Sequence, residues 1–162
     1  MSTADQLLLD LGQTAGLTQP LRFDAQGCAR LVFDTSLAID FERDDDARVL
    51  QVYSVLGPLP AEGREALYRR LLEANLFGAA TSGSTLAVDG NTQEVVLCRT
   101  VDVDEMGGPA FVQLVERFVA TADDWKKLLL SGGGVNPSVP PMEPGLIPGA
   151  MMSVPLSGFL RA

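Results

Sequence analysis

Histidine is absent from this chain of 162 residues. Because histidine is the usual general base, proton shuttle and metal ligand near neutral pH, its absence excludes Ser-His-Asp and Cys-His catalysis and the common zinc sites. Cysteine is scarce: Cys28 and Cys98 are the only two, and no C-x-x-C occurs. We expect both to be buried or half-buried thiols and not a disulfide. The sequence therefore assigns no catalytic residue, no metal and no cofactor.

Long apolar runs and excess positive charge are also missing. No stretch approaches the roughly 20 apolar residues of a membrane helix, and the N-terminus lacks the basic and apolar regions of a secretory signal. The chain has 12 Lys and Arg against 21 Asp and Glu, for a formal net charge of -9. Nucleic acid is an unsuitable partner, because Lys and Arg must neutralise its phosphates. We expect a cytoplasmic protein that binds neither membranes nor nucleic acid.

Apolar residues make up 46% of the chain, enough for one domain with a modest core. Their spacing predicts strands and helices. In chain order these are a helix over 3–15, strands over 29–33, 36–42 and 48–56, a helix over 61–75, strands over 85–88 and 94–101, and a helix over 105–131. A meander of strands with segregated helices indicates an α+β fold, a twisted antiparallel sheet with helices packed on it.

Local signals mark the ends of several elements. Ser2 or Thr3 can cap the first helix, and Gly16 is well placed to stop it. The Asp-Gly-Asn sequence at 89–91 predicts a hairpin turn. Three consecutive aspartates at 44–46 form an acidic turn and not a calcium site, because the EF-hand spacing is missing. Apolar residues on both faces of the third strand indicate a central strand, or one covered by helices on one side and by a partner on the other.

The helix predicted over 61–75 has an apolar face wider than one core contact requires. Its apolar positions are Ala66, Leu67, Tyr68, Leu71, Leu72, Ala74 and Leu76. One core-facing stripe occupies about a 100° arc, so the wider face predicts a second buried contact, such as a homodimer interface. The candidate dimer-interface residues are Leu67, Tyr68, Leu71 and Leu72.

The character of the chain changes at Gly132, the first of three consecutive glycines. Residues 132–162 hold six of the ten prolines and only two charged residues, Glu143 and Arg161. We predict a domain over 1–131 followed by a flexible Pro/Gly-rich tail over 132–162. The tail is more apolar than an ordinary linker, so a second hypothesis is that it lies on an apolar surface of its own protein or of a neighbour.

Residues 6–131 resemble the CesT (Tir-chaperone) family of type III secretion chaperones, the class I effector chaperones. The matching pieces, in order, are the leucines of the first helix, the strands over 37–41 and 49–59, the sequence Leu-Leu-Glu-Ala-Asn-Leu-Phe-Gly at 71–78, Leu-Ala-Val-Asp at 86–89, and the segment 118–125. The resemblance implies a small acidic homodimer of the bacterial cytoplasm. It also implies a client: the N-terminal segment of a secreted effector, kept soluble and secretion-competent without ATP.

The resemblance further implies that the effector lies over apolar patches of the first helix and the sheet, and adds a strand to a sheet edge. The matching effector-binding candidates are Leu7, Leu8, Leu11, Leu31, Phe33, Leu37, Ile39 and Phe41. Taken singly, each of these positions is better explained by plain core packing, because apolar stripes usually face the core.

Two other classes of function are an enzyme and an adaptor protein. An enzyme would need catalytic groups, and pairs of acids such as Asp123 and Asp124 are ordinarily only solvated. No phosphate-binding G-x-x-x-x-G-K-[ST] motif occurs either, so we do not expect an enzyme. An adaptor or regulatory protein of the secretion system, with the same fold but a natively folded partner, remains the alternative.

Overall fold

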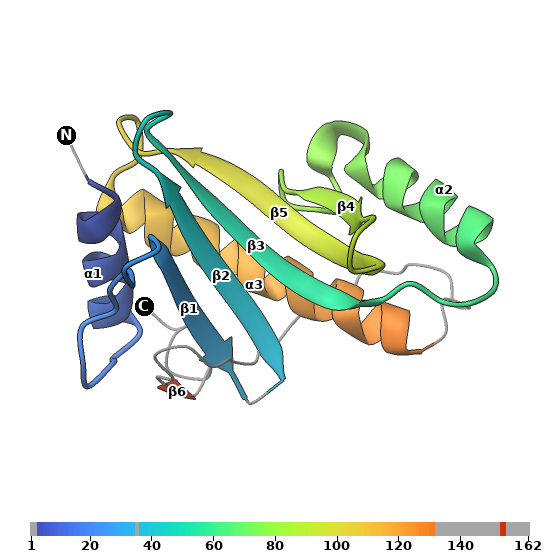
Figure 1. Ribbon diagram of the computed structural model, residues 1–162, viewed down its shortest axis with the longest axis horizontal. Helices are drawn as coiled ribbons and strands as arrows, with labels where there is room; N and C mark the ends of the chain where they lie inside the picture. Colours follow the sequence, from blue (N-terminus) through green and yellow to red (C-terminus); the bar gives the residue numbers. More distant parts are fainter. Residues whose placement is uncertain (1–2, 35, 132–152, 155–162) are drawn as a thin grey trace.

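The computed structural model describes residues 3–34, 36–131 and 153–154, and it has the predicted α+β architecture (Figure 1). The elements in chain order are α1 (Ala4–Thr14), β1 (Cys28–Phe33), β2 (Leu37–Asp44), β3 (Val49–Pro58), α2 (Arg64–Asn75), the short 3-10 helix η1 (Leu76–Gly78), β4 (Thr85–Asp89), β5 (Glu94–Asp102), α3 (Gly108–Leu130) and β6 (Ser153–Val154). Every element predicted within 1–131 is present. The largest errors are the starts of α2 and α3, predicted at 61 and 105.

The strands form one sheet in the order β4-β5-β3-β2-β1-β6. β1 to β5 pair antiparallel, and β3 lies between β5 and β2, which confirms the prediction that it is central. β6 was not predicted: it runs parallel to β1 at the far edge. Apart from Ser153 and Val154, the predicted flexible tail lies outside the described residues.

One face of the sheet is covered by α3, which crosses behind it with α1 alongside (Figure 1). The apolar residues of α3 recur at helical spacing and are buried against the strands. Phe111 of α3 meets Phe41 of β2 with ring centroids 6.2 Å apart. On β3, Leu50 and Val52 on this face are fully buried, whereas Tyr53 on the opposite face is half-buried. The core therefore lies between the sheet and α3.

The predicted limits of α1 are confirmed in atomic detail. The Thr3 hydroxyl accepts a hydrogen bond from the N–H of Gln6 at 3.2 Å, as an N-cap does. At the other end Gly16 has a φ of 68°, and the N–H of Leu17 donates to the carbonyl of Gly12. The helix therefore begins and ends where its local sequence specifies.

Asn75, at the end of α2, joins this helix to β4. Its amide nitrogen donates to the carbonyl of Leu86 at 3.0 Å, and its amide oxygen accepts from the N–H of Leu86 at 2.8 Å. Both backbone groups of Leu86 on the side away from β5 are thus satisfied by one side chain. The asparagine in the 71–78 sequence closes part of the β4 edge and fixes α2 beside it.

The turn after α2 depends on a close approach of two glycines. Gly78 has a φ of 67°, and a Cβ added there would lie 2.9 Å from the Cα of Gly83. The loop that follows is held by α3, because the indole N–H of Trp125 donates to the carbonyl of Ala80 at 3.0 Å. Phe77 therefore projects from a turn whose position is set by both α2 and α3.

We predict that Asn75→Leu lowers the free energy of unfolding by about 1–3 kcal/mol, because it leaves the N–H and C=O of Leu86 without their partner. Urea denaturation followed by circular dichroism measures this change. Asn91→Ala, in the exposed hairpin turn, is the control and should leave the midpoint unchanged. Equal midpoints for the Asn75 variant and the unchanged protein would show that the hydrogen bonds between Asn75 and Leu86 contribute nothing to stability.

Candidate functional site: sheet edges and an exposed helix stripe

The side chains predicted to contact an effector lie in the core of the isolated chain. All have zero exposure: Leu7, Leu8, Leu11, Leu31, Phe33, Leu37, Ile39 and Phe41. They share one cluster because α1 and the inner faces of β1 and β2 meet there beneath α3. Core packing therefore accounts for these positions in the isolated chain. Their contact with a client stays a prediction. The β1 side chains that reach the surface are those of Cys28 and Arg30.

The four candidate dimer residues divide between the two sides of α2. Leu71 is buried at 4% exposure, and Leu67 packs partly buried against the core. Leu72 is 71% exposed, and Tyr68 also lies at the surface. Helical geometry explains the division, since Leu71 and Leu72 differ by about 100° around the axis.

An exposed apolar surface continues beyond α2. We call it the α2 stripe; its residues are Tyr68, Leu72, Leu76 and Phe77. Phe77 is 96% exposed and has a φ of 56°, a conformation that few non-glycine residues adopt. Sequence reasoning did not assign Leu76 or Phe77 to the interface, although it noted both in the 71–78 motif. The sequence signal that could have identified Phe77 is its position directly before the glycine of a turn.

The two edges of the sheet differ in what covers them. At β4, the Asn75 side chain bonds both backbone groups of Leu86. At β1, the partner is another strand: Val32 pairs with Ser153, and Phe33 with Val154. Within the described residues, no strand pairs with the rest of β1 on that side. At the start of β1, the N–H of Cys28 donates to the carboxylate of Asp24 at 2.9 Å, and its carbonyl accepts from the N–H of Asp24 at 2.7 Å. Both ends of the β1 edge therefore have hydrogen-bonding partners.

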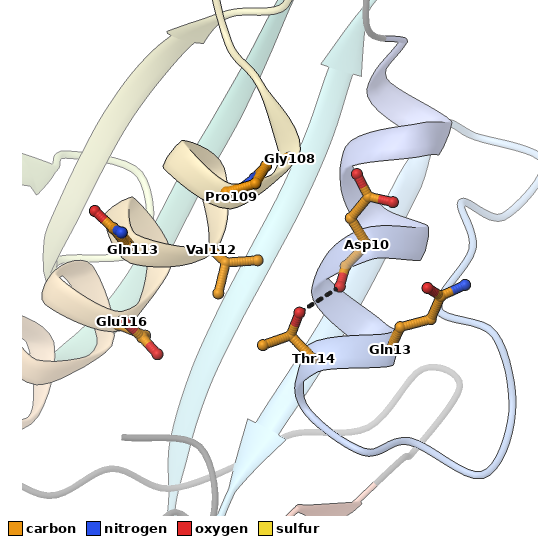
Figure 2. A pocket seen from close by; sticks show the side chains of 8 residues that line it. All are labelled: Asp10, Gln13, Thr14, Gly108, Pro109, Val112, Gln113 and Glu116. Carbon is orange, nitrogen blue, oxygen red and sulfur yellow. Dashed lines mark hydrogen bonds between the residues drawn. The ribbon is translucent and has the colours of Figure 1, made fainter. Parts of the chain in front are cut away.

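A pocket of about 400 Å³ separates the middle of α1 from the first turns of α3 (Figure 2). It is lined by Asp10, Gln13, Thr14, Gly108, Pro109, Val112, Gln113 and Glu116. The approach of the two helices is close at one end, where a Cβ on Gly108 would meet the carboxylate of Asp10. Its lining combines the carboxylates of Asp10 and Glu116 with apolar surface, including that of Pro109 and Val112.

Burial raises the pKa of Glu116 in this pocket, against a smaller lowering by Arg117. Burial raises the pKa of Asp124 on the same helix as well, and the charge of Asp123 adds to that effect. A carboxyl group with a raised pKa in the folded state opposes folding once it is ionised. Both acids therefore cost stability at neutral pH.

The described residues carry no arrangement typical of catalysis. Within them, no group of three or more His, Cys, Asp or Glu side chains could hold a metal ion. Cys28 and Cys98 are free, half-buried thiols, as predicted. Burial raises the pKa of each, so both are protonated and weakly nucleophilic at neutral pH. No helix in the part of the chain that the structure describes has the length and apolar character to cross a membrane.

A family model, that of the Tir chaperone protein (CesT) family, matches residues 6–126. This chain belongs to that family. A Chlamydia pneumoniae protein is 30% identical over 122 residues, spanning 75% of this chain and 92% of the relative. The family resemblance inferred from the sequence is thereby confirmed, and it assigns this CesT-family chain to the chaperones.

Solved structures show the same fold at low sequence identity. The ExsC–ExsE complex contains a chain with a TM-score of 0.64 and 20% identity, covering 77% of this chain and 92% of that one. The HopA1–SchA chaperone–effector complex gives 0.58 and 21%, covering 75% and 88%. The Yersinia pestis type III secretion chaperone SycH, with a fragment of YscM2, gives 0.58 and 18%, covering 74% and 97%. The CesT fold is therefore shared along most of the described chain.

We predict that Glu116→Gln raises the melting temperature by a few degrees near neutral pH. Because the folded-state pKa is raised, the penalty appears as pH rises through the ordinary glutamate pKa and is complete above the raised value. Below that window both proteins carry a neutral side chain and should melt alike. Thermal denaturation across acidic to neutral pH checks this, and an equal difference at every pH would contradict the electrostatic cause.

Proposed function

We propose that this chain is a type III secretion chaperone of the bacterial cytoplasm, which binds the N-terminal segment of a secreted effector. It keeps that segment soluble and secretion-competent without ATP and without catalysing a reaction. The observation that carries the proposal is the family match over residues 6–126. Further support comes from structural neighbours described as chaperone–effector and chaperone–partner complexes.

The geometry suits a protein that holds a polypeptide. An extended client can form hydrogen bonds with a sheet edge, and its alternate side chains then lie over the two faces of the sheet. Burial of apolar client surface contributes about 25 cal/mol per Å², less the cost of ordering the chain. Binding of this kind is reversible and requires no nucleotide.

The same proposal includes a homodimer through the α2 stripe. Large apolar side chains gathered on one exposed face commonly mark a protein interface. A two-fold dimer uses the same surface on both copies, so the α2 stripe, with Leu72 between Tyr68 and Leu76, is a suitable contact. The flanking charges of α2, including the Glu65–Arg69 pair, would form the polar rim.

For the dimer, we predict that Leu72→Asp weakens self-association, because it places a charge on the exposed stripe and leaves the core untouched. Sedimentation velocity measures the effect as a shift from dimer to monomer. Leu71→Asp, by contrast, should unfold the chain, because Leu71 is buried. Placing the same substitution at Leu71 would therefore not test the interface.

The matched control for this experiment is Ala66→Asp, which adds the same charge at an exposed position on another side of α2. It should leave the dimer intact. Dimerisation of Leu72→Asp at the same concentration as the unchanged protein would place the interface elsewhere.

For the client, we predict that affinity capture from the native cell retrieves a secreted protein whose protected region lies near its N-terminus. Limited proteolysis of the complex followed by mass spectrometry maps that region. Adding ATP should leave the affinity unchanged. Capture of a partner bound only in its folded state would favour the adaptor alternative, and protection of a C-terminal region would contradict the proposed mode of binding.

A further inference from the structure

The pocket between α1 and α3, which we call the α1–α3 pocket, has the size of a ligand site. Its volume is about 400 Å³, above the roughly 300 Å³ at which ligand pockets begin, so one long side chain fits inside it. Its walls come from the middle of α1 and the first turns of α3 (Figure 2). None of the eight residues that line it is basic. The charged groups of the lining, Asp10 and Glu116, are both negative.

The carboxylate of Asp10 already has partners in the fold. Its Oδ1 accepts a hydrogen bond from the side-chain amide of Gln6 at 2.7 Å. Its other oxygen lies against the start of α3, because a Cβ on Gly108 would clash with it. The first turn of α3 has no acidic residue, and Gly107 has no side chain that could cap the helix. A negative charge stabilises a helix N-terminus, so Asp10 supplies that charge to α3.

Glu116 is the second carboxylate, and its position in the pocket is different. It lies two turns further along α3, about 12 Å from Gly108 by helix geometry, at the end of the pocket near Thr14 (Figure 2). Its side chain is half-buried, and none of the hydrogen bonds and ion pairs among the described residues involves it. Burial raises its pKa, and the neighbouring charge of Arg117 offsets that rise only in part. A cation placed here would stabilise the ionised carboxylate.

Apolar surface lies beside this carboxylate. Pro109 and Val112 belong to the lining, and Val112 precedes Glu116 by four residues, so the two side chains share one face of α3. Lysine and arginine pack their methylene stems along apolar surface and keep the charged end in a polar place. An anion would be repelled by Glu116, and an apolar side chain would bury the carboxylate further without a partner. The lining therefore matches a cation on an aliphatic stem.

The elements that form the pocket carry further acids. Asp5 lies on α1, and Asp104 and Glu105 lie just before α3. Two arginines are already held by these acids, since Arg43 is bound to Asp5 and Arg48 to Asp104. The chain as a whole has a formal net charge of -9. A surface of this kind attracts a basic segment from solution.

We propose that the α1–α3 pocket holds one basic side chain, a lysine or an arginine, of the client polypeptide, with its stem along Val112 and its charge at Glu116. This inference rests on the proposed function and adds the chemistry of one client residue. A single carboxylate without a bonded partner matches a side chain with one charge, whereas a free polyamine carries at least two. The pocket is therefore assigned to a residue of a polypeptide.

The first experiment titrates the isotopically labelled full-length protein with the peptide acetyl-Ala-Ala-Arg-Ala-Ala-amide, followed by nuclear magnetic resonance. Backbone amide signals of residues 10–14 and 108–116 should shift and saturate. A peptide with norleucine in place of arginine keeps an apolar stem without the charge, and it should bind about fivefold more weakly, as expected for the loss of one partly exposed ion pair. Equal binding of the two peptides, or shifts confined to other residues, would overturn the proposal.

The second experiment repeats the titration with Glu116→Gln, which keeps the shape of the pocket and removes its charge. The variant should bind the arginine peptide about fivefold more weakly. It should also remain folded, because it loses a carboxylate that opposes folding at neutral pH. The control is Glu62→Gln, which removes the same charge at an exposed position before α2. Its affinity should be unchanged, and equal affinities for Glu116→Gln and the unchanged chain would overturn the proposal.

The third experiment distinguishes a side chain from a free amine. Putrescine, titrated under the same conditions, should bind more weakly than the arginine peptide, because it has no peptide backbone to add contacts. Tighter binding of putrescine would overturn the assignment to a client.

The fourth experiment uses the effector fragment obtained by affinity capture, and it separates this inference from the proposed function. Each lysine and arginine of the fragment is replaced in turn by methionine. One replacement should weaken binding to the unchanged chain about fivefold and have no effect on binding to Glu116→Gln, because the two partners of one ion pair are coupled. If no replacement behaves in this way, the inference fails and the chaperone function stands. If capture yields no secreted protein, the proposed function fails, while the peptide titration still reports whether the pocket accepts a basic side chain.

Discussion

The burial of one sheet face under α3 is the constraint on which the rest of the molecule depends. Phe111 against Phe41 is its centre, and the fully buried Leu50 and Val52 of β3 extend it. A single helix can cover one face of the antiparallel sheet formed by β1 to β5, but it cannot also bond the backbone groups along the two edges. The edges at β4 and β1, and the outer side of α2, are therefore left to be satisfied in other ways. Each of these places is a possible point of contact with another polypeptide.

Both edges of the sheet are partly closed by residues outside the strands. At β4 a side chain close in sequence, Asn75, bonds both backbone groups of Leu86. This closure forms together with α2 and needs no partner. At β1, Asp24 bonds both backbone groups of Cys28, and β6, which is distant in sequence, pairs with Val32 and Phe33. Each edge is thus closed in part by one polar residue close in sequence, and such closures satisfy backbone groups that would otherwise be open to pairing with another chain.

Much of the fold was predictable because its signals are local. The cap at Thr3, the stop at Gly16 and the apolar spacing of α3 each depend on residues a few positions apart. The candidate site was harder, because periodicity shows which residues share a face but not whether that face is inside. The adjacent Leu71 and Leu72 look alike in sequence, yet one is buried and the other exposed. β6 was missed for another reason: two residues before a proline carry no period, and only the distant edge of β1 makes them a strand.

The arrangement of the two surfaces decides whether self-association and client binding can coexist. The α2 stripe lies at the β4 end of the sheet, and β1 lies toward the other end, with β5, β3 and β2 between β4 and β1 (Figure 1). At about 4.8 Å per strand, β4 and β1 lie roughly 19 Å apart. A dimer through α2 would leave the β1 edge of each copy outside the contact. One client could then engage two edges, and the second contact would benefit from the local concentration that the first provides. Dimerisation in this fold would therefore strengthen holding without any change in the site itself.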